Sequence, residues 1–200
     1  MKEKLKKVNF VLDLDLTLIC AEALEEYDKI KYKDKAKKFK YENMEDYYII
    51  FQRPFLQEFL TYIFTHFNVS VWTAASKDYA LFIIDKIIIK NKIERKIHWI
   101  FFNYHCDRSK KNKNGTKDLS MLWDFYKIKT FTKYNTIILD DYSEVYKTQP
   151  NNTIIAKEFQ FYDKNSNKDS FLQKLIIELD NIKNGFNKNS IKNINTILRS

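Results

Sequence analysis

The sequence predicts an α/β fold, with helices on both faces of a parallel sheet. Short apolar segments alternate along the chain with longer segments whose apolar residues recur at helical spacing, which is typical of βα units. Two of the apolar segments, residues 8–12 and 136–139, lead directly into acidic residues. Because the carboxyl ends of parallel strands meet at one edge of a sheet, we expect a ligand site there.

The chain has the size of one domain. Its 200 residues are 44% hydrophobic, enough for a single core. We expect one domain over residues 1–184, with a small β insert at about residues 21–52. Residues 185–200 are rich in Asn and Lys, with isoleucines at helical spacing, so we expect a tail that is weakly helical or disordered. The 2 glycines argue against glycine-rich nucleotide-binding loops.

The expected elements are, in chain order, a strand at 8–12, a hairpin at 39–41 and 47–52, a helix from 54, a strand at 69–72, a helix following Ser76, a strand at 97–102, a loop at 108–116, a helix at 118–126, strands at 136–139 and 154–156, and a helix at 171–182. The strands are short β-branched and aromatic runs bounded by polar residues. Pro54 suits a first helical position, where its missing N–H costs nothing. The basic segment 108–116 lacks apolar periodicity, hence its assignment as a loop.

The net charge is +9, and it comes from 31 Lys against only 4 Arg. A nucleic-acid-binding protein would be expected to show Arg clusters or a known module, and neither is present, so nucleic acid is an unlikely partner. A positive field still attracts acidic or phosphorylated partners. The basic segment at 29–40 is either a solvated face or a surface that steers such a partner, and the sequence does not separate these two.

Cysteine usage indicates a reducing compartment. Cys20 and Cys106 are too few for a disulfide framework or a four-cysteine zinc site. A cysteine-based phosphatase is excluded, because the arginine of a Cys-x5-Arg motif is replaced by Glu26 and Asn112. We find no signal-peptide core and no apolar stretch long enough for a membrane, so we expect a soluble intracellular protein, in nucleus or cytoplasm. The sequence does not indicate an oligomeric state.

The first chemical motif is Asp13-x-Asp15-x-Thr17, which follows the first strand. Alternate residues of an extended segment point the same way, so the two carboxylates lie on one side. A close pair can bind a divalent cation and divide the roles of nucleophile and proton donor. With 15 Asp in the chain, however, one Asp-x-Asp is expected by chance, and an acidic turn is the alternative.

Three further groups lie where the same site is expected. Thr73 follows a strand, Lys117 precedes a helix, and Asp140 and Asp141 end another strand. Each has an ordinary alternative: a helix N-cap for Thr73, a solvated lysine, and a charged turn. Their order and common placement at strand ends favour one shared site.

These residues resemble the four motifs of the haloacid dehalogenase-like superfamily of Mg²⁺-dependent phosphotransferases, which share a Rossmann-like sheet. More narrowly, the chain is similar to the small phosphatases that act on the C-terminal domain of RNA polymerase II. The segments that carry this similarity are 10–15, 53–54, 59–60, 72–74, 117–120 and 138–141. The similarity extends from residue 8 to residue 179.

The resemblance implies an aspartyl-phosphate mechanism. Asp13 is then the nucleophile and Asp15 the general acid and base, while Thr73 and Lys117 hold the transferring oxygens. It also implies Mg²⁺, held by Asp13, the backbone carbonyl of Asp15, and the pair Asp140 and Asp141. The implied substrate is phosphoserine or phosphothreonine in a protein tail, and the resemblance names the tail of RNA polymerase II as a candidate.

Some positions depart from this pattern. Leu16 stands where relatives usually carry Glu, and Asp141 where they usually carry Asn. In relatives, an aromatic residue and a tyrosine together bind a substrate proline. Tyr79 matches the tyrosine, but Ala23 stands at the aromatic position, so the sequence does not decide whether a proline pocket is present. Arg108 or Lys110 is expected to contact substrate, as a basic residue near this position does in relatives.

Two other functions remain open from sequence. The same catalytic set would serve a phosphatase of small molecules or nucleic-acid termini. Alternatively, the domain binds phosphopeptides without turnover. Replacing Asp13 by Asn separates these classes, since it abolishes hydrolysis but spares binding.

Overall fold

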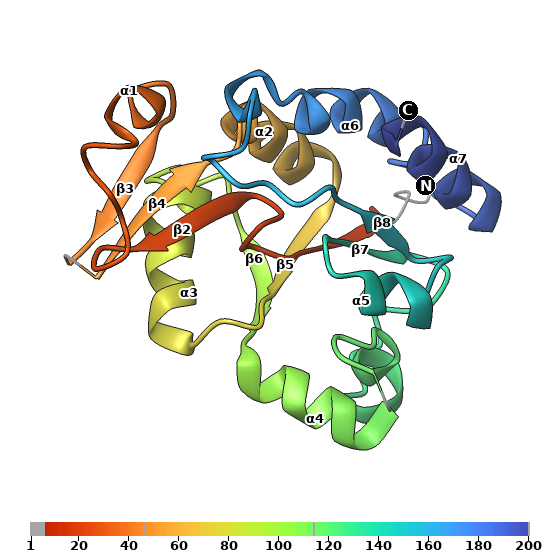
Figure 1. Ribbon diagram of the computed structural model, residues 1–200. Coiled ribbons are helices and arrows are strands. Elements are labelled where there is room, and N and C mark those ends of the chain that lie inside the picture. Colours follow the sequence, from red (N-terminus) through yellow and green to blue (C-terminus); the bar gives the residue numbers. More distant parts are fainter. Residues whose placement is uncertain (1–6, 46, 114, 200) are drawn as a thin grey trace.

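The computed structural model describes residues 7–45, 47–113 and 115–199. It confirms the α/β fold: five parallel strands form a central sheet in the order β6-β5-β1-β7-β8, with helices on both faces (Figure 1). The segment 1–6, which opens the expected domain, and Ser200, at the end of the expected tail, lie outside the described residues.

The strands are β1 (Asn9–Leu12), β2 (Ile19–Ala23), β3 (Tyr41–Met44), β4 (Tyr48–Gln52), β5 (Asn68–Trp72), β6 (Ile97–Phe101), β7 (Thr136–Asp140) and β8 (Thr153–Ile155). The helices are α1 (Lys33–Ala36), α2 (Leu56–His66), α3 (Lys77–Ile83), α4 (Asn103–Lys113), α5 (Ser143–Thr148), α6 (Phe171–Asp180) and α7 (Lys188–Arg199). Three other helical segments are the π-helices η1 (Ile84–Ile89) and η2 (Met121–Phe125) and the 3-10 helix η3 (Ser166–Lys168).

The register of the sheet aligns the strand ends. Leu12, at the end of the central strand β1, pairs with Val71 of β5 on one side and with Leu139 of β7 on the other. The residues that follow, Asp13 and Asp140, are therefore neighbours at the carboxyl edge. Thr73, two residues after Val71, lies at the same edge.

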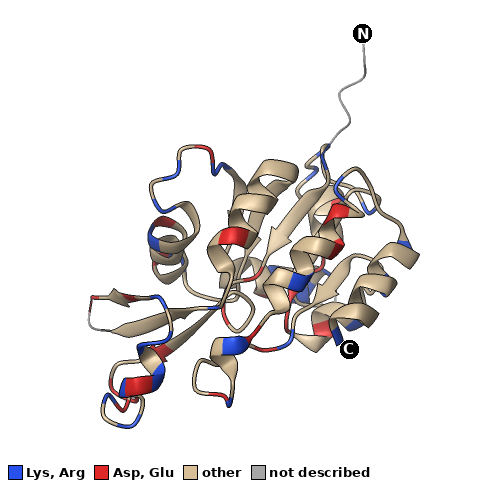
Figure 2. Ribbon diagram, turned by 90° about the horizontal axis from the view of Figure 1, so that it is seen from above, with Lys and Arg blue, Asp and Glu red and all other residues tan. Residues whose placement is uncertain are grey.

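Alternate strand residues supply two separate cores. Phe10 and Leu12 of β1 belong to a cluster that includes residues of α2, α6 and α7, whereas Val11 packs with Trp72 in a cluster beneath η2 and α5. Charged residues are spread over the helices and loops (Figure 2). Within the described residues, no helix has the length and apolar content needed to cross a bilayer.

The insert after β1 forms a small antiparallel sheet in the order β2-β4-β3. The expected hairpin is present as β3 and β4, but the prediction missed β2, which pairs with β4 along its whole length. The missed strand is only partly buried, and Ile19 is its one large apolar side chain, so no apolar alternation marks it as a strand. A third core lies under the insert, where the rings of Phe51 and Phe161 stack with centroids 3.9 Å apart.

The prediction of a loop at 108–116 is wrong for most of that segment, because α4 extends to Lys113. Only two residues of this helix, Cys106 and Ser109, are buried. A helix that buries so little carries no apolar stripe, so periodicity could not reveal it.

Two predicted helix boundaries also shift. α2 begins at Leu56 rather than Pro54, since Phe55 adopts a left-handed φ of 63°. The helix expected at 118–126 is the shorter π-helix η2, which buries Met121 and Leu122. Both differences leave the order of elements unchanged.

The tail contains a regular helix. Ile191 and Ile194 of α7 are buried in the main core cluster, against the sheet edge formed by β8. Asn195 of α7 accepts a hydrogen bond from the Ile155 N–H and donates one to the Thr153 carbonyl, both at 2.9 Å. Of the two alternatives for this segment, the structure shows a helix, attached to the edge of the sheet.

Candidate active site

A cavity of about 430 Å³ opens at the carboxyl edge of the sheet. Its lining includes Asp13, Asp15, Thr73, Lys117, Asp140 and Asp141, which the sequence analysis had selected as catalytic or metal-binding candidates. They come from the ends of β1, β5 and β7 and from the segment before η2. The fold thus brings together groups that are up to 128 residues apart, Asp13 to Asp141.

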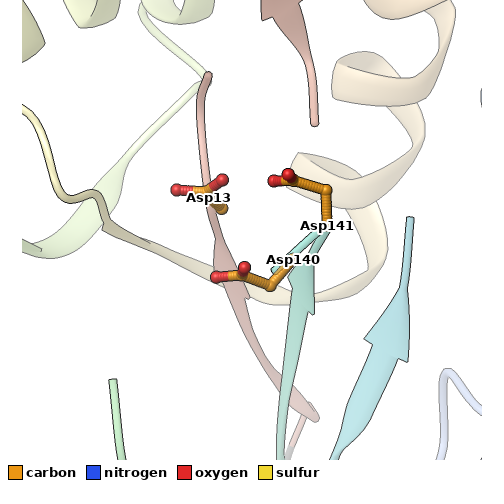
Figure 3. A group of neighbouring side chains, drawn as sticks. All are labelled: Asp13, Asp140 and Asp141. Carbon is orange, nitrogen blue, oxygen red and sulfur yellow. The ribbon is translucent and has the colours of Figure 1, made fainter. Parts of the chain in front are cut away.

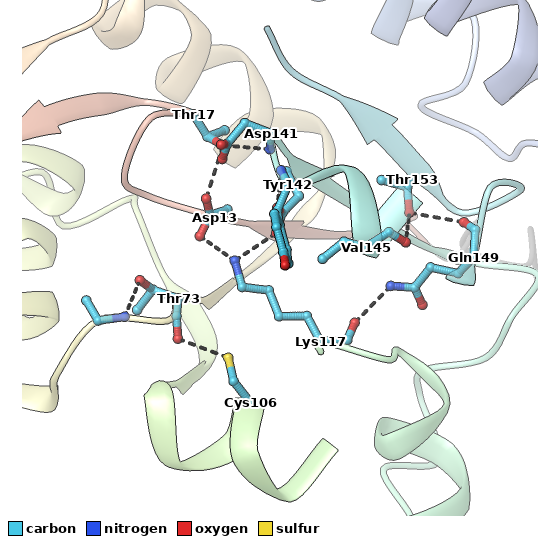
Figure 4. Close-up of polar contacts among 12 residues, drawn as sticks. Asp13, Thr17, Thr73, Cys106, Lys117, Asp141, Tyr142, Val145, Gln149 and Thr153 are labelled. Atoms are coloured by element: carbon cyan, nitrogen blue, oxygen red, sulfur yellow. Dashed lines mark hydrogen bonds and ion pairs between the residues drawn. The ribbon is translucent and has the colours of Figure 1, made fainter. Parts of the chain in front are cut away.

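Lys117 lies between the carboxylates of Asp140 and Asp13, the latter labelled in Figure 4. Its Nζ is 2.5 Å from Asp13 Oδ1 and 2.7 Å from Asp140 Oδ2, and all three side chains are buried. Burial by itself would lower the pKa of this lysine, but the two carboxylates outweigh it, and the pKa is raised. Lys117 is therefore a fixed positive charge beside the candidate nucleophile, not a solvated surface lysine.

Thr17 joins the two acidic motifs. Its hydroxyl accepts a hydrogen bond from the Asp141 N–H at 3.1 Å. As a donor, Thr17 Oγ1 lies 2.8 Å from Asp141 Oδ1 and 3.1 Å from Asp13 Oδ2. Since a hydroxyl has only one proton, it serves one carboxylate at a time. This bridge fixes the loop after β1 against the end of β7.

The residues Asp13, Asp140 and Asp141 form a candidate metal site (Figure 3). Each offers a carboxylate oxygen, and these oxygens lie within 4.8 Å of one another. In the described lining of the cavity, the acids Asp13, Asp15, Asp107, Asp140 and Asp141 outnumber Lys110 and Lys117. Oxygen ligands with excess negative charge suit a hard divalent cation, so the residues fit Mg²⁺.

The pKa values of the acids show the same excess of charge. Burial, reinforced by the negative charge of Asp13, raises the pKa of Asp141 from 3.8 to about 7. Burial also raises the pKa of Asp140, although Lys117 opposes this effect. A bound cation would favour the ionised forms of both residues.

Asp15 occupies a different environment from Asp13. Burial raises its pKa to about 6, against a hydrogen bond that lowers it. That bond comes from the Tyr79 hydroxyl, 2.5 Å from Asp15 Oδ1. A carboxyl group that exchanges its proton near neutral pH is suited to acid–base chemistry. Tyr79, expected to contact substrate, thus also positions the candidate general acid.

The ring of Tyr79 packs edge-on against Tyr48, with centroids 5.4 Å apart. Tyr48 begins β4 and pairs directly with Ala23 of β2. Ala23 stands at the position where relatives carry the aromatic partner of the tyrosine. Sequence reasoning missed Tyr48, because only the pairing of β2 with β4 places it beside Ala23. An aromatic pair therefore adjoins Asp15 through the Tyr79 hydroxyl, although neither ring belongs to the described lining of the cavity.

Local backbone conformation orients Thr73 and Lys117. The Thr73 hydroxyl accepts a hydrogen bond from the Ala75 N–H at 3.1 Å, so it closes a turn after β5 and does not cap α3, whose N-cap is Ser76. Lys117 has a left-handed φ of 52°. Gln149 donates a hydrogen bond to its carbonyl at 2.8 Å, which stabilises this strained conformation.

Of the two basic residues expected to contact substrate, Lys110 lines the cavity, together with Asn103 and Asp107 of the same helix. Arg108 does not belong to that lining; it faces a neighbouring cavity with Tyr104 and Phe125. The difference follows from α4: residues three and four apart share a face, and Arg108 lies on the next one.

Arg53 supports the site from behind. Its side chain is buried, and it donates hydrogen bonds to the Thr17 carbonyl at 2.8 Å and to Asp169 at 2.9 Å. The sequence analysis included residues 53–54 in the resemblance but gave Arg53 no role, since its acidic partner lies 116 residues away. Asp169 thus provides the ion-pair partner that the buried charge of Arg53 requires.

The parallel sheet, the acidic cluster and the buried lysine define the class as a haloacid dehalogenase-like α/β protein. Within this class, residues 8–191 match the model of the NLI interacting factor-like phosphatases, and the chain belongs to that family. The match includes the insert, the cavity and the start of α7.

Two viral relatives are similar over most of their length. The CTD phosphatase-like protein 355R of Invertebrate iridescent virus 6 is 46% identical over 171 residues, covering 84% of this chain and 94% of the relative. Its namesake from Invertebrate iridescent virus 3 is 43% identical over 187 residues, covering 90% and 100%.

Solved structures show the same fold. The RNA polymerase II CTD phosphatase Fcp1 superposes with a TM-score of 0.55 at 19% identity, covering 87% of this chain and 49% of that one. A fission yeast Fcp1 variant bound to beryllium fluoride gives 0.57 at 17% identity, covering 97% and 62%. This chain therefore spans roughly half to three-fifths of the solved Fcp1 chains, and the likeness concerns the fold.

Proposed function

We propose that this protein is a Mg²⁺-dependent phosphatase that hydrolyses phosphoserine or phosphothreonine in a protein substrate. The observation that carries this proposal is the meeting of Asp13, Asp140 and Asp141 within 4.8 Å, beside the buried Lys117, in a cavity that Asp15 and Thr73 also line. Membership of a phosphatase family supports it.

In the proposed reaction, a carboxylate oxygen of Asp13 attacks phosphorus, and the bond to the serine or threonine oxygen breaks. Asp15 gives its proton to that leaving oxygen, so the alcohol departs neutral. Asp15 then takes a proton from the water that attacks the phosphoaspartate, which releases phosphate and restores Asp13. The raised pKa of Asp15, about 6, supports both roles.

Attack by one anion on another requires positive charge at the phosphoryl oxygens. Lys117 and the Thr73 hydroxyl are the groups of this chain that would contact those oxygens. Asp13, Asp140, Asp141 and the backbone carbonyl of Asp15 would hold Mg²⁺, which when bound supplies the remaining charge neutralisation.

The proposed substrate is an extended peptide, and the tail of RNA polymerase II is the first candidate because the relatives are CTD phosphatase-like. The pair of Tyr48 and Tyr79 supports a peptide substrate. Two partly exposed rings beside the catalytic acid offer an apolar contact to a flanking residue, which a small phosphate ester would not need.

The test is hydrolysis of an aryl phosphate, with and without Mg²⁺, by the parent, by Asp13→Asn and by the control Asp85→Asn. Asp85 is an exposed acid on η1, so its replacement makes the same chemical change away from the site. We expect Mg²⁺-dependent turnover that falls at least about 10³-fold in Asp13→Asn and is unchanged in Asp85→Asn.

A folded parent that turns over no phosphate ester in Mg²⁺ would contradict the proposal and favour a binding module. Turnover of sugar phosphates or nucleic-acid ends in preference to phosphopeptides would keep the mechanism and reject the substrate class.

A further inference from the structure

A second cavity lies beside the catalytic cavity, along the adjacent face of α4. Asn103, Asp107 and Lys110 line the catalytic cavity, at spacings of four and three residues. Tyr104, Arg108 and Lys111, each one position further along, line the second cavity, whose volume is about 370 Å³. Asp107 lines both, so the two cavities adjoin across this helix.

Two aromatic rings hold Arg108 in the second cavity. The guanidinium carbon is 5.2 Å from the centre of the Tyr104 ring and 5.3 Å from that of Phe125, on η2. Both rings are large and exposed, at 56% and 44%. Cation–π contacts from two sides restrict the guanidinium plane without using its N–H donors.

The donors of this guanidinium are uncommitted. Among residues 7–45, 47–113 and 115–199, no hydrogen bond or ion pair to the Arg108 side chain is found. Asp124, next to Phe125, is paired instead with Lys113 at 2.7 Å. Among the described residues that line this cavity, Asp107 is the acid, against the two cations Arg108 and Lys111. The cavity therefore has an excess of positive charge and a preoriented planar donor.

We propose that this second cavity binds an oxyanion, a carboxylate or a second phosphate, on the same peptide whose phosphate reaches Asp13. A planar guanidinium pairs with either group through two parallel hydrogen bonds. The shared wall of α4 allows one extended chain to reach both cavities. This inference rests on the proposed phosphatase function and adds a preference for acidic or multiply phosphorylated substrates.

The test compares three sets of phosphoserine peptides by kcat/KM for phosphate release. The first set has neutral residues on both sides of the phosphoserine. The second set places a single Glu one to about five residues away on either side, and the third set places a second phosphoserine at the same positions. An extended chain rises about 3.3 Å per residue, so these spacings reach a neighbouring cavity. We expect the parent to prefer an acidic peptide over the neutral one by about tenfold at one position.

Variants assign this preference to Arg108. Arg108→Gln should reduce the ratio between acidic and neutral peptides to within about twofold, and Arg108→Lys should give an intermediate ratio because it keeps the charge and loses the planar fork. Lys174→Gln, on the exposed side of α6, removes the same charge elsewhere and should keep the parent ratio. The Glu and phosphoserine sets decide which oxyanion is favoured.

A parent without acidic preference, or an Arg108→Gln variant that keeps it, would overturn the inference. Failure of the phosphatase itself is separable, since it appears as absent aryl phosphate turnover by the parent. In that event the same peptides, fluorescently labelled, are compared by binding anisotropy. Equal affinities for neutral and acidic peptides would then reject the second cavity as an oxyanion site, and a preference that depends on Arg108 would support it.

Discussion

Lys117 illustrates how burial and charge set the behaviour of a single side chain in this protein. A buried lysine is costly unless it is paired, and here two carboxylates pair with it at 2.5 and 2.7 Å. The third acid of the cluster, Asp141, has a threonine hydroxyl but no such cation among the described residues. The uncompensated charge therefore resides mainly on Asp141.

Asp141→Asn should change the pH dependence of stability in metal-free buffer. The pKa of Asp141 is about 7 in the folded protein, above its ordinary value of 3.8. Below pH 3.8 the group is protonated in both the folded and the unfolded state, and the folded protein has its full stability. This stability is lost as the pH rises through 7, because the folded state must then hold a buried carboxylate. The variant carries no such penalty. At pH 8 in chelator it should be more stable than the parent by on the order of 2 kcal/mol, a figure discounted for partial burial.

Urea unfolding at pH 4 and pH 8 tests this, with the two proteins expected to differ much less at pH 4. Added Mg²⁺ should stabilise the parent more than the variant at pH 8, because the cation binds the folded carboxylates. A variant that is less stable than the parent at pH 8 in chelator would show that Asp141 is not an uncompensated charge.

At the scale of elements, strand pairing supplies what the local sequence lacks. The pairing of β2 with β4 sets Tyr48 beside Ala23, and the Tyr48 ring then reaches Tyr79. Directly paired residues on neighbouring strands lie side by side on the same face of the sheet, so a large side chain on one strand can fill the space that a small residue leaves on the other. An insert that was expected to be merely a hairpin thus supplies a ring that packs on Tyr79, whose hydroxyl donates a hydrogen bond to Asp15.

Tyr48→Ala should weaken binding of a phosphopeptide. Loss of one aromatic contact corresponds to about a fivefold rise in KM, with a smaller change in kcat because Tyr48 does not touch the reacting groups. Steady-state kinetics on one phosphopeptide measure it. Tyr47→Ala is the matched control: Tyr47 is 67% exposed and precedes β4, so its KM should match that of the parent. Equal KM values for all three proteins would remove Tyr48 from the peptide site.

At the scale of the whole molecule, α7 completes the fold. The sheet would otherwise expose β8 as an edge strand, with unpaired backbone groups. Asn195, which is buried, pairs with one N–H and one carbonyl of that strand. Ile191 and Ile194 extend the main core over the same edge. Residues near the C-terminus therefore stabilise the sheet whose carboxyl edge carries the acidic cluster.

Asn195→Ala should destabilise the protein by about 2 kcal/mol, since it leaves two buried backbone groups without partners. Urea unfolding monitored by circular dichroism measures the change. Asn193→Ala, on the exposed face of the same helix, should cost less than about 0.5 kcal/mol. Equal effects of the two substitutions would mean that the tail helix adds nothing specific to the sheet edge.

The sequence by itself determined the order of the main elements and the residues of the acidic cluster. Apolar segments that end in Asp13 and in Asp140 are local features, and their meaning in a parallel sheet is general. The central strands, most of the helices and the residues of the acidic cluster could therefore be predicted. The N-cap alternative for Thr73 and the solvated alternative for Lys117 were also local readings, and neither fits the structure.

Only the tertiary structure decided which weakly patterned segments fold and which distant side chains meet. α4 buries two residues, and β2 is short, with Ile19 as its one large apolar side chain, so neither carries a periodic signal. The pairs of Tyr48 with Tyr79 and of Arg53 with Asp169 form because strands and helices far apart in the chain pack side by side. Such contacts depend on the register and the packing of whole elements, which a local pattern does not encode.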